Sequence, residues 1–491
     1  MLLAAAFCSG AAAAPAASTA APAAEPGTTR PDSELAAVEL AAASAAGAVF
    51  RPQAYGARAD GKHNDTAAVL AAVVACRASA SKGGGCSLMF SGGSFLTGPF
   101  TLPSHSVVTV AAGATLLAAP MEQWKAAGWS ARALLTGEGL TNITLTGDGT
   151  IDGNGAAWWA VTKDDLHYRP GLMVLSGTNG LVIEDVLFQN SPNHNIVLAE
   201  STHVRVRRLR VSAPHHSPNT DGINFAGGQD QSIVDSHISN GDDCVSIVCG
   251  GATVPAPPGA GGGTIPYGGN VIVRNVSCDG GHGISIGSIR HGYVSNVTVE
   301  GVIFNGSDNG ARIKTYPNHS GLITGITYRN IVMNKVVNPI LINGAYCPIS
   351  QKPYPCPPGA VAVKIENIVF EDITGSGAVG RVGNFACSSV SPCRNITMRN
   401  VDLTAASHVF GKATFECANA HGPAAVNVVP MSCLKPDRSG LPAPTSKTDH
   451  AQTIARPTSD EDEPVQITDL KITDIVKARP SLNPTNHVES G

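Results

Sequence analysis

The sequence contains few charged residues, no Cys-x-x-Cys pair and no long apolar run. Asp, Glu, Lys and Arg make up only 14% of the 491 residues, whereas Gly occurs 54 times. A helical bundle needs a charged outer face, so this composition favours stacked strands with many tight turns. The net charge of −4 gives no bulk attraction to nucleic acid or to an anionic membrane. The missing Cys-x-x-Cys pairs weaken a zinc-site interpretation.

The two ends of the chain differ in composition from its middle. Residues 1–24 form a short Ala-rich apolar run without Lys or Arg that ends in small residues, and we interpret them as a secretory signal peptide or Ala-rich leader. This run is too short and too rich in Ala for a membrane span. Residues 434–491 are rich in Pro, Ser, Thr and charge, and we expect most of them to be poorly ordered. Residues 48–433 are expected to form one large domain.

The cysteines and glycosylation sequons fit a secreted protein. Secretion predicts oxidised cysteines, and short loops favour four local bridges: Cys76–Cys86, Cys347–Cys356, Cys387–Cys393 and Cys417–Cys433. Seven Asn-x-Ser/Thr sequons are typical of a glycoprotein. They begin at Asn64, Asn142, Asn275, Asn296, Asn305, Asn318 and Asn395.

A short apolar unit recurs through the middle of the chain. The pattern apolar-x-x-apolar-x-apolar begins at Ile183, Val206, Val273, Val299, Tyr328, Ile365 and Met398, with a weaker copy at Ile233. Successive starts differ by 23, 27, 40, 26, 29, 37 and 33 residues. A single copy cannot bury its own apolar face, whereas stacked copies share a continuous core. The repeat therefore predicts a solenoid.

The solenoid is predicted to be an all-β parallel β-helix. The apolar segments are β-branched and are separated by Asn, Gly and Asp, which favours strands and turns. A leucine-rich repeat is the main alternative, but its Leu-x-x-Leu-x-Leu signature is missing. Each coil carries a second short segment after a turn. These segments begin at Asn195, Gly222, Cys244, Gly283, Arg312 and Pro339.

The N-terminal part of the domain is predicted to cap the solenoid. Residues 54–76 are expected to end in an α-helix that covers the open apolar end, because terminal repeats need caps. Either Asn64 or Asp65 is the expected N-cap residue. The apolar stripe of this helix is expected to consist of Val69, Leu70, Val73 and Val74.

Aligning the second segments predicts a ladder of polar residues. Their first buried apolar residues are Ile196, Ile223, Val245 and Ile284, and two places earlier stand His194, Asp221, Asp243 and His282. Side chains two places apart share a face of a strand, so stacking is expected to place these four together. Asp242 adjoins Asp243 at the turn. One coil further on, Arg312 and Lys314 flank the buried Ile313.

This coincidence of charged residues favours a function over a structural role. A single Asp at a strand start is commonly a turn former, but stacked like charges are costly unless something uses them. Cleavage of a glycosidic bond needs one protonated carboxyl group and one carboxylate. Crowded carboxylates raise one another's pKa, so one of them can stay protonated. Arg312 and Lys314 supply positive charge where an acidic sugar could bind.

At these residues the chain resembles the polygalacturonases, family 28 of the glycoside hydrolases. The matching motifs are SPNTDGI at 217–223, GDDC at 241–244, GHG at 281–283 and RIK at 312–314, in the family's order. The likeness extends from about Tyr55 to about Cys433. It implies a right-handed parallel β-helix over 48–433 that hydrolyses α-1,4-linked galacturonan with inversion.

The resemblance also implies a role for each site residue. Asp242 is expected to be the general acid, and Asp221 and Asp243 are expected to activate the water. His282 is expected to support protonation of the acid. Arg312 and Lys314 are expected to be exposed cleft cations that bind the substrate carboxylate. The other expected substrate-binding residues are Asn219 and Tyr346, and the local sequence before Tyr346 departs from the family pattern.

The resemblance further implies a disulfide between Cys244 and Cys278 that braces the coils beside the site. With the four local pairs it accounts for ten cysteines and leaves Cys249 as the eleventh beyond the leader. The Pro- and Gly-rich insertion at 250–269 explains the spacing of 40 residues. This insertion is expected to line or narrow one end of the cleft.

The protein is therefore expected to be secreted and extracellular in the cell wall. We expect a monomer that acts on the pectic polysaccharide homogalacturonan, without a cofactor, a metal, nucleic acid or a membrane. A hydrolase of branched or rhamnose-containing pectin usually departs from the NTD, GHG and RIK segments. A pectate lyase needs calcium carboxylates and an arginine base, and leaves the GHG histidine without a role. A non-catalytic carbohydrate-binding or adhesion β-helix should lack one of the aspartates. Endo and exo action both stay open.

The predicted register also bears on stereochemistry. Asp221 and Asp243 are expected about 5 Å apart, one strand spacing. Asp242 is expected further from both, because neighbours along a strand alternate faces. At the turn this alternation is expected to be partial, which lets all three aspartates line the cleft. Inversion needs a gap of roughly 6.5–9.5 Å between acid and base. The expected product is therefore the β anomer.

Overall fold

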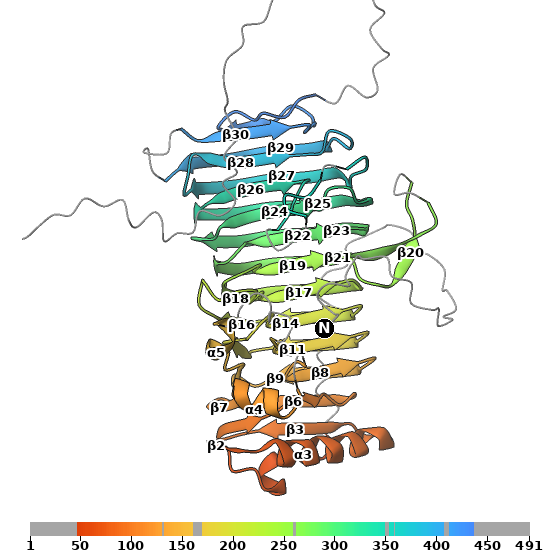
Figure 1. The fold of residues 1–491 in the computed structure, drawn as a ribbon, viewed down its shortest axis with the longest axis vertical. Coiled ribbons are helices and arrows are strands. Elements are labelled where there is room, and N and C mark those ends of the chain that lie inside the picture. Colours follow the sequence, from red (N-terminus) through yellow and green to blue (C-terminus); the bar gives the residue numbers. More distant parts are fainter. Residues whose placement is uncertain are drawn as a thin grey trace, which may run out of the picture. The chain divides into compact units, whose positions relative to one another are not determined.

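The structure is a computed structural model that describes residues 47–129, 132–160, 169–258, 262–348, 353–357, 359–406 and 412–436. Its strands stack as successive rungs of a parallel β-helix (Figure 1), as the repeat predicted, and the β-helix is right-handed, as the resemblance implied. The predicted leader (1–24) and nearly all of the predicted tail (434–491) lie outside the described residues. Among the described residues, no helix is long and apolar enough to cross a bilayer.

One face of the solenoid is an eleven-stranded parallel sheet, called the site sheet below because the candidate site lies on it. The second segments of the repeat form its central strands. In spatial order the site sheet consists of β5 (Phe100–Thr101), β8 (Leu135–Glu138), β11 (Met173–Ser176), β14 (Ile196–Ala199), β17 (Ile223–Ala226), β19 (Val245–Val248), β22 (Ile284–Ile289), β24 (Asn309–Thr315), β26 (Asn338–Asn343), β28 (Arg381–Ala386) and β30 (Thr414–Ala418).

The remaining strands of the coils form a twenty-stranded sheet in two rows that later merge. The first row is β1 (Val49–Phe50), β3 (Cys86–Phe90), β6 (Ser106–Val110), β9 (Thr141–Thr146), β12 (Asn179–Glu184) and β15 (Thr202–Arg207). The second row is β2 (Asp60–Asn64), β4 (Gly93–Thr97), β7 (Ala114–Ala118), β10 (Thr150–Asp152), β13 (Leu187–Gln189) and β16 (Arg210–Ser212). Both rows pair with β18, and from there each coil has one long bent strand. These long strands are β18 (Gln229–Asn240), β21 (Thr264–Gly280), β23 (Gly292–Asn305), β25 (Gly321–Val336), β27 (Lys364–Gly377) and β29 (Arg394–Ala405), followed by the short β31 (Val426–Val429).

The remaining elements are short and lie outside these rows of stacked strands. They are the 3-10 turn η1 (Pro52–Tyr55), α3 (Thr66–Ser79), the π turn η2 (Ala80–Gly84), α4 (Met121–Ala126), α5 (Ala156–Trp159) and β20 (Thr253–Pro255). β20 is the twentieth strand of the larger sheet. β20 belongs to the predicted insertion at 250–269 and pairs antiparallel with the start of β21. In Figure 1 this hairpin projects away from the stacked coils.

The repeated unit straddles a corner of the coil. Its first apolar residue lies just before the corner, its fourth and sixth residues lie just after it, and its third residue takes a left-handed backbone that turns the chain. This third position, called the corner ladder below, has φ between 49° and 64° in eight coils. Its members are Asp185, Arg208, Asp235, Asn275, Gly301, Asn330, Asp372 and Asn400. Asn, Asp and Gly tolerate this conformation best, which explains their recurrence in the repeat.

One predicted copy of the unit is out of register. Tyr328 pairs with Phe370, and Phe370 with Met398, so the unit of that coil begins at Phe370 and not at Ile365. Ile365 pairs with Ile323, which lies at the preceding corner of its coil. The sequence at that corner also has an apolar residue followed two places later by an Asn or Gly with a left-handed backbone. The two corners of a coil are therefore hard to distinguish from the sequence pattern.

Helix α3 covers the first coil, as predicted, but with a different buried face. Its buried residues are Ala68, Val69, Ala72, Val73 and Cys76. Two predicted stripe residues, Leu70 and Val74, are 41% and 62% exposed. A stripe with helical spacing passes through the small alanines, which let the helix lie close to the coil.

The two residues before α3, Asn64 and Asp65, make different hydrogen bonds at its N-terminus. The side-chain oxygen of Asn64 accepts the N–H of Thr66 (3.0 Å) and so satisfies a donor of the first turn. The carboxylate of Asp65 instead accepts the N–H groups of Arg58 (2.8 Å) and Ala59 (3.0 Å) and so fixes the preceding loop.

All four predicted local disulfides are present, as is the bridge that the resemblance implied. The local pairs are Cys76–Cys86, Cys347–Cys356, Cys387–Cys393 and Cys417–Cys433. Cys244–Cys278 joins the start of β19 to β21, with Cα atoms 5.9 Å apart. Cys249 is also disulfide-bonded, so no free thiol occurs among the described residues.

Candidate active site

The candidate site lies where four neighbouring strands of the site sheet begin. Across β14, β17, β19 and β22 the paired residues are Ile196, Ile223, Val245 and Ile284. This confirms the predicted register. The N–H of Gly222 donates to the carbonyl of Asp243 (2.9 Å), and the N–H of His282 donates to the carbonyl of Asp242 (2.7 Å). Strand pairing therefore brings the three aspartates and His282 to one edge of the sheet.

Asp243 is a buried carboxylate with both oxygens engaged. The hydroxyl of Ser285 donates to Oδ1 (2.7 Å) and the ammonium of Lys314 donates to Oδ2 (2.7 Å). The Arg312 guanidinium lies 3.7 Å from Oδ1. Burial lowers the pKa of Lys314, but the negative charge of Asp243, with smaller contributions from Tyr346 and Asp242, raises the pKa above its usual value, so the lysine stays charged.

The expectation that Arg312 and Lys314 are exposed cations is wrong. Only 9% of Arg312 and 6% of Lys314 is exposed. Both residues belong to β24, which has a paired strand on each side, and their side chains reach Asp243 instead of bulk solvent. Their charge therefore stabilises a carboxylate of the protein itself, in addition to any part it plays toward a ligand.

Asp242 is surrounded by hydrogen-bond donors. His282 Nδ1 lies 2.8 Å from Oδ1, and the N–H of Asp243 donates to the same oxygen (2.9 Å). The Nδ2 of Asn219 donates to Oδ2 (3.2 Å). On the other side of the imidazole ring, His282 Nε2 lies 3.6 Å from Oδ2 of Asp308. His282 is therefore held between two carboxylates.

The Asp242–His282 pair shares one proton. Burial raises the pKa of Asp242, but the His282 cation, its hydrogen bond and the charges of Lys314 and His194 together hold the pKa well below the usual aspartate value. Burial lowers the pKa of His282, but the charge and hydrogen bond of Asp242, together with the charge of Asp243, raise the pKa above its usual value. The resting proton is thus on the imidazole, directly beside Asp242, from which it can be returned.

The pKa of Asp221 is shifted in the opposite direction, above the usual aspartate value. Burial is the main cause of this rise. The His194 cation opposes it, and the negative charges of Asp242 and Asp243 add to it. His194 Nδ1 lies 3.0 Å from Oδ1 of Asp221. The sequence placed His194 in the ladder without a role, and the structure shows it as the partner of Asp221. Its raised pKa makes Asp221 more basic than Asp242, whose pKa is lowered.

Tyr346 lies beside the two cations, although its local sequence departs from the expected pattern. Its ring centre is 5.4 Å from both the Arg312 guanidinium and the Lys314 ammonium. The ring of Tyr316 meets it edge to face at 5.6 Å. Burial raises the pKa of the Tyr346 phenol in spite of the neighbouring positive charges. The structure therefore brings Tyr346 into the group that contains Asp243.

The carboxylates of Asp242 and Asp243 are closer than expected. One oxygen of each, together with a nitrogen of His282, lie within 4.8 Å of one another. This differs from the expected wide gap, because Asp242 lies at the turn, where the alternation of strand faces is incomplete. Three such groups could hold a metal ion, but Lys314 and Ser285 already occupy both oxygens of Asp243. The prediction that no metal is required stays a prediction.

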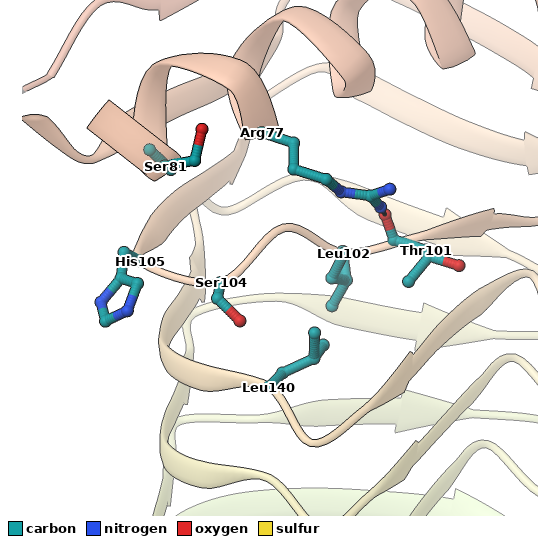
Figure 2. A pocket seen from close by; sticks show the side chains of 8 residues that line it. Arg77, Ser81, Thr101, Leu102, Ser104, His105 and Leu140 are labelled. Carbon is teal, nitrogen blue, oxygen red and sulfur yellow. Dashed lines mark hydrogen bonds between the residues drawn. The ribbon is translucent and has the colours of Figure 1, made fainter. Parts of the chain in front are cut away.

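A separate hollow lies near the capping helix and does not belong to this group (Figure 2). It has a volume of about 400 Å³. Its lining residues are Arg77, Ala80, Ser81, Thr101, Leu102, Ser104, His105 and Leu140. The hollow adjoins β5, four strands from β17, which places it about 19 Å along the solenoid from Asp221. No carboxylate lines it, so it offers no acid–base pair.

Sequence reasoning missed several residues that contact the site, among them Ser285, Arg169 and Asp308. Ser285 pairs with Arg312 in the outward row of the site sheet, so its position could have been found by extending the strand alignment. Arg169 donates to Oδ1 of Asn219 (2.7 Å) from the coil before the site. Its sequence context contains no motif, so no local signal pointed to it.

The chain is similar to known proteins over most of the described domain. Residues 88–433 match the family model described as Glycosyl hydrolases family 28. A probable polygalacturonase of Arabidopsis thaliana is 34% identical over 323 residues, which cover 64% of this chain and 68% of that protein. A polygalacturonase of Malus domestica is 31% identical over 416 residues, 80% of this chain and 81% of that protein.

Solved structures share the fold. The polygalacturonase from Erwinia carotovora ssp. carotovora superposes with a TM-score of 0.60 at 25% identity, covering 77% of this chain and 96% of that one. Endopolygalacturonase I from Stereum purpureum, solved in complex with two galacturonate molecules, has a TM-score of 0.51 at 21% identity and covers 69% and 93%. The second likeness concerns the fold alone.

Proposed function

The chain belongs to glycosyl hydrolases family 28, and on that premise we propose that it is a polygalacturonase. It hydrolyses the α-1,4-galacturonosidic bonds of homogalacturonan and inverts the anomeric centre. The substrate is a polyanion, so each sugar carries a carboxylate that needs positive charge in the cleft.

The observation that carries this proposal is the grouping of Asp221, Asp242 and Asp243 at the starts of adjacent strands, each with a cationic partner. The partners are His194 (3.0 Å), His282 (2.8 Å) and Lys314 (2.7 Å), respectively. Three crowded carboxylates are costly to maintain, and the pairing leaves them with different proton affinities. Divergent proton affinities among neighbouring carboxyl groups are what acid–base catalysis requires.

Each group then has a step in the reaction. The Asp242–His282 pair donates its proton to the glycosidic oxygen as the bond to the anomeric carbon breaks. A water attacks that carbon and loses a proton to the Asp221–Asp243 side of the site. Asp221 is the better acceptor, because its pKa is raised and because Lys314 neutralises Asp243. Asn219, Arg312, Lys314 and Tyr346 bind the substrate in this scheme.

The protein is proposed to act outside the cell, as a monomer in the cell wall. The five disulfide bridges among the described residues support an oxidising compartment. Residues 1–24 are proposed as the leader, 48–433 as the catalytic domain and 434–491 as a C-terminal tail. No cofactor, nucleic acid or membrane takes part.

The decisive assay measures reducing ends released from polygalacturonate. Hydrolysis yields reducing ends without an unsaturated uronate, whereas a lyase yields both, so ultraviolet absorbance of the products separates them. Failure on polygalacturonate, combined with activity on rhamnose-containing or branched pectin, would replace the proposed substrate. Sizing of the products adds the mode of action: monomer alone means exo cleavage and mixed oligomers mean endo cleavage.

Proton NMR of the first product tests inversion. The short distance between oxygens of Asp242 and Asp243 does not by itself favour an inverting pair, so inversion here depends on a water held between Asp221 and Asp243. The expected first product carries the β anomer at the new reducing end. An initial α anomer means a covalent intermediate and overturns the roles of all three aspartates.

A further inference from the structure

Arg169 is a buried cation in the coil before the proposed active site. It precedes Pro170 on the approach to β11, and only 3% of its surface is exposed. Its guanidinium donates to three neutral oxygens: Nη1 to the carbonyls of Pro192 (2.9 Å) and Pro218 (2.6 Å), and Nη2 to Oδ1 of Asn219 (2.7 Å). Burying a guanidinium among neutral oxygens costs free energy, so this arrangement requires a reason beyond packing.

The three oxygens belong to the turns that lead into β14 and β17. The first turn ends one residue after His194, and the second contains Asn219 and Asp221. A planar guanidinium donates several hydrogen bonds in fixed directions, whereas the three donors of an ammonium rotate freely at the end of a flexible chain. Arg169 therefore ties together the two turns that lead to the His194–Asp221 pair.

The hydrogen bond from Arg169 also sets the orientation of the Asn219 amide. A guanidinium only donates, so the atom facing it must be the amide oxygen. The amide nitrogen then faces Asp242 and donates to its Oδ2 (3.2 Å). Oδ2 is the oxygen that His282 does not contact. The backbone at Asn219 is left-handed (φ 56°), which aims the side chain between these two partners.

The charges of Arg169 and Asp242 also influence each other. Burial lowers the pKa of Arg169, and the Asp242 carboxylate raises it in part. The guanidinium stays charged at every working pH, because arginine is not deprotonated in proteins. It therefore provides a constant field behind Asp242, whereas His282 gains and loses its proton.

We propose that Arg169 is a positioning residue for Asp242, and that it acts through Asn219. It holds the carboxyl group of the proposed acid toward the glycosidic oxygen without touching the substrate. This inference rests on the acid role proposed for Asp242. Loss of the guanidinium frees the Asn219 amide to rotate, and Asp242 loses its fixed direction. A misplacement of about 1 Å at a reacting group costs on the order of 100-fold in rate.

The test is a double-mutant cycle on kcat, with Arg169→Met and Asn219→Ala measured singly and together. Arg169→Met should lower kcat by roughly 10- to 100-fold and leave KM within about twofold. In the Asn219→Ala background the same change should lower kcat by less than about threefold, because the Asn219 amide through which Arg169 acts on Asp242 is already missing. Arg169→Lys should recover part of the activity. Arg205→Met, on the other sheet, is the control for loss of an arginine and should retain full activity.

The outcomes separate this inference from the proposed function. An active Asp242→Asn enzyme removes the acid role, whatever Arg169 does. An inactive Asp242→Asn enzyme combined with normal kcat in Arg169→Met overturns the positioning role alone. If Arg169→Met lowers kcat equally in the wild type and in Asn219→Ala, then Arg169 acts by stabilising the fold. That result also overturns the positioning role. Circular dichroism checks folding. If Arg169→Met does not fold, the double-mutant cycle is measured with Arg169→Lys and Asn219→Ala instead.

Discussion

The corner ladder and the active-site edge are both rows of polar residues stacked by the same coil register. They differ in where their side chains find hydrogen-bonding and ionic partners. In the corner ladder, successive members bond directly to each other: Asn275 donates to Asp235 (3.0 Å) and Asn400 donates to Asp372 (2.8 Å). A donor in one coil meets an acceptor in the next, so this part of the row needs no outside partner.

At the active-site edge the stacked residues are carboxylates, which repel one another. Each carboxylate is instead neutralised by a residue from a different strand, as in the pairs Asp221–His194, Asp242–His282 and Asp243–Lys314. The comparison indicates that stacking of donors with acceptors stabilises the solenoid, whereas stacking of like charges is retained for chemistry. Changes in the ladder should therefore affect stability alone, and changes at the edge should affect activity.

The largest expected effect belongs to Asp242→Asn. An amide cannot give a proton to the leaving oxygen, and general acid catalysis contributes roughly 10²–10⁴-fold, so kcat on polygalacturonate should fall by that factor. The circular dichroism spectrum and melting temperature should stay near wild type. Asp372→Asn in the corner ladder is the matched control, since Asn can still accept from Asn400, and it should be fully active. Near-normal hydrolysis by Asp242→Asn would contradict the difference between the two rows.

Lys314→Met should affect both stability and activity. It leaves the Asp243 carboxylate buried without its closest cation, and breaking a buried ion pair from one side costs about 3 kcal/mol or more. Urea unfolding should show this loss, and kcat should fall with it. The exposed Lys364→Met is the control and should stay within about 0.5 kcal/mol of wild type. A raised KM with unchanged stability would mean that Lys314 serves only the substrate.

His282→Asn should shift the pH dependence of kcat/KM. The essential proton is lost as pH rises through the pKa of the Asp242–His282 pair, and the Asp242 carboxylate holds the pKa of His282 above its usual value. The wild-type enzyme should therefore keep activity above the ordinary histidine pKa of about 6.5. Without the imidazole the alkaline limb should move to lower pH, with about tenfold less activity per pH unit beyond it. An unmoved alkaline limb would place the essential proton on another group, such as Asp221.

The smallest expected effect belongs to Asn400 in the corner ladder. Asn400→Ala loses the hydrogen bond to Asp372 and puts Ala at φ 50°, so it should cost about 1–2 kcal/mol of stability. Asn400→Gly keeps the left-handed backbone without strain and should cost less. Both variants should have wild-type kcat when assayed below their melting temperatures. A catalytic defect in either variant would mean that the two rows are coupled through the coil.

Much of the active-site edge could be predicted because strand pairing is periodic. Aligning Ile196, Ile223, Val245 and Ile284 on their burial was sufficient to place the ladder. The same approach failed at Ile365, because two corners of one coil share an apolar residue followed by a left-handed residue. It also gave the wrong exposure for Lys314 and Arg312. The alternation of side chains along a strand predicts on which face of the sheet a side chain lies, but it does not predict what covers that face.

The sequence by itself determined that the chain is a parallel β-helix and which carboxylates share an edge. These properties follow from short-range patterns that recur from coil to coil. The four local disulfides followed from the short spacing of their cysteines, and Cys244–Cys278 was implied by the family resemblance. The tertiary structure alone decided that Lys314 is buried against Asp243, that Asp242 lies close to Asp243, and that Arg169 reaches Asn219 from 50 residues away. The physical reason is that these contacts join turns of different coils. Their geometry depends on how each turn folds, and a repeat pattern does not encode it.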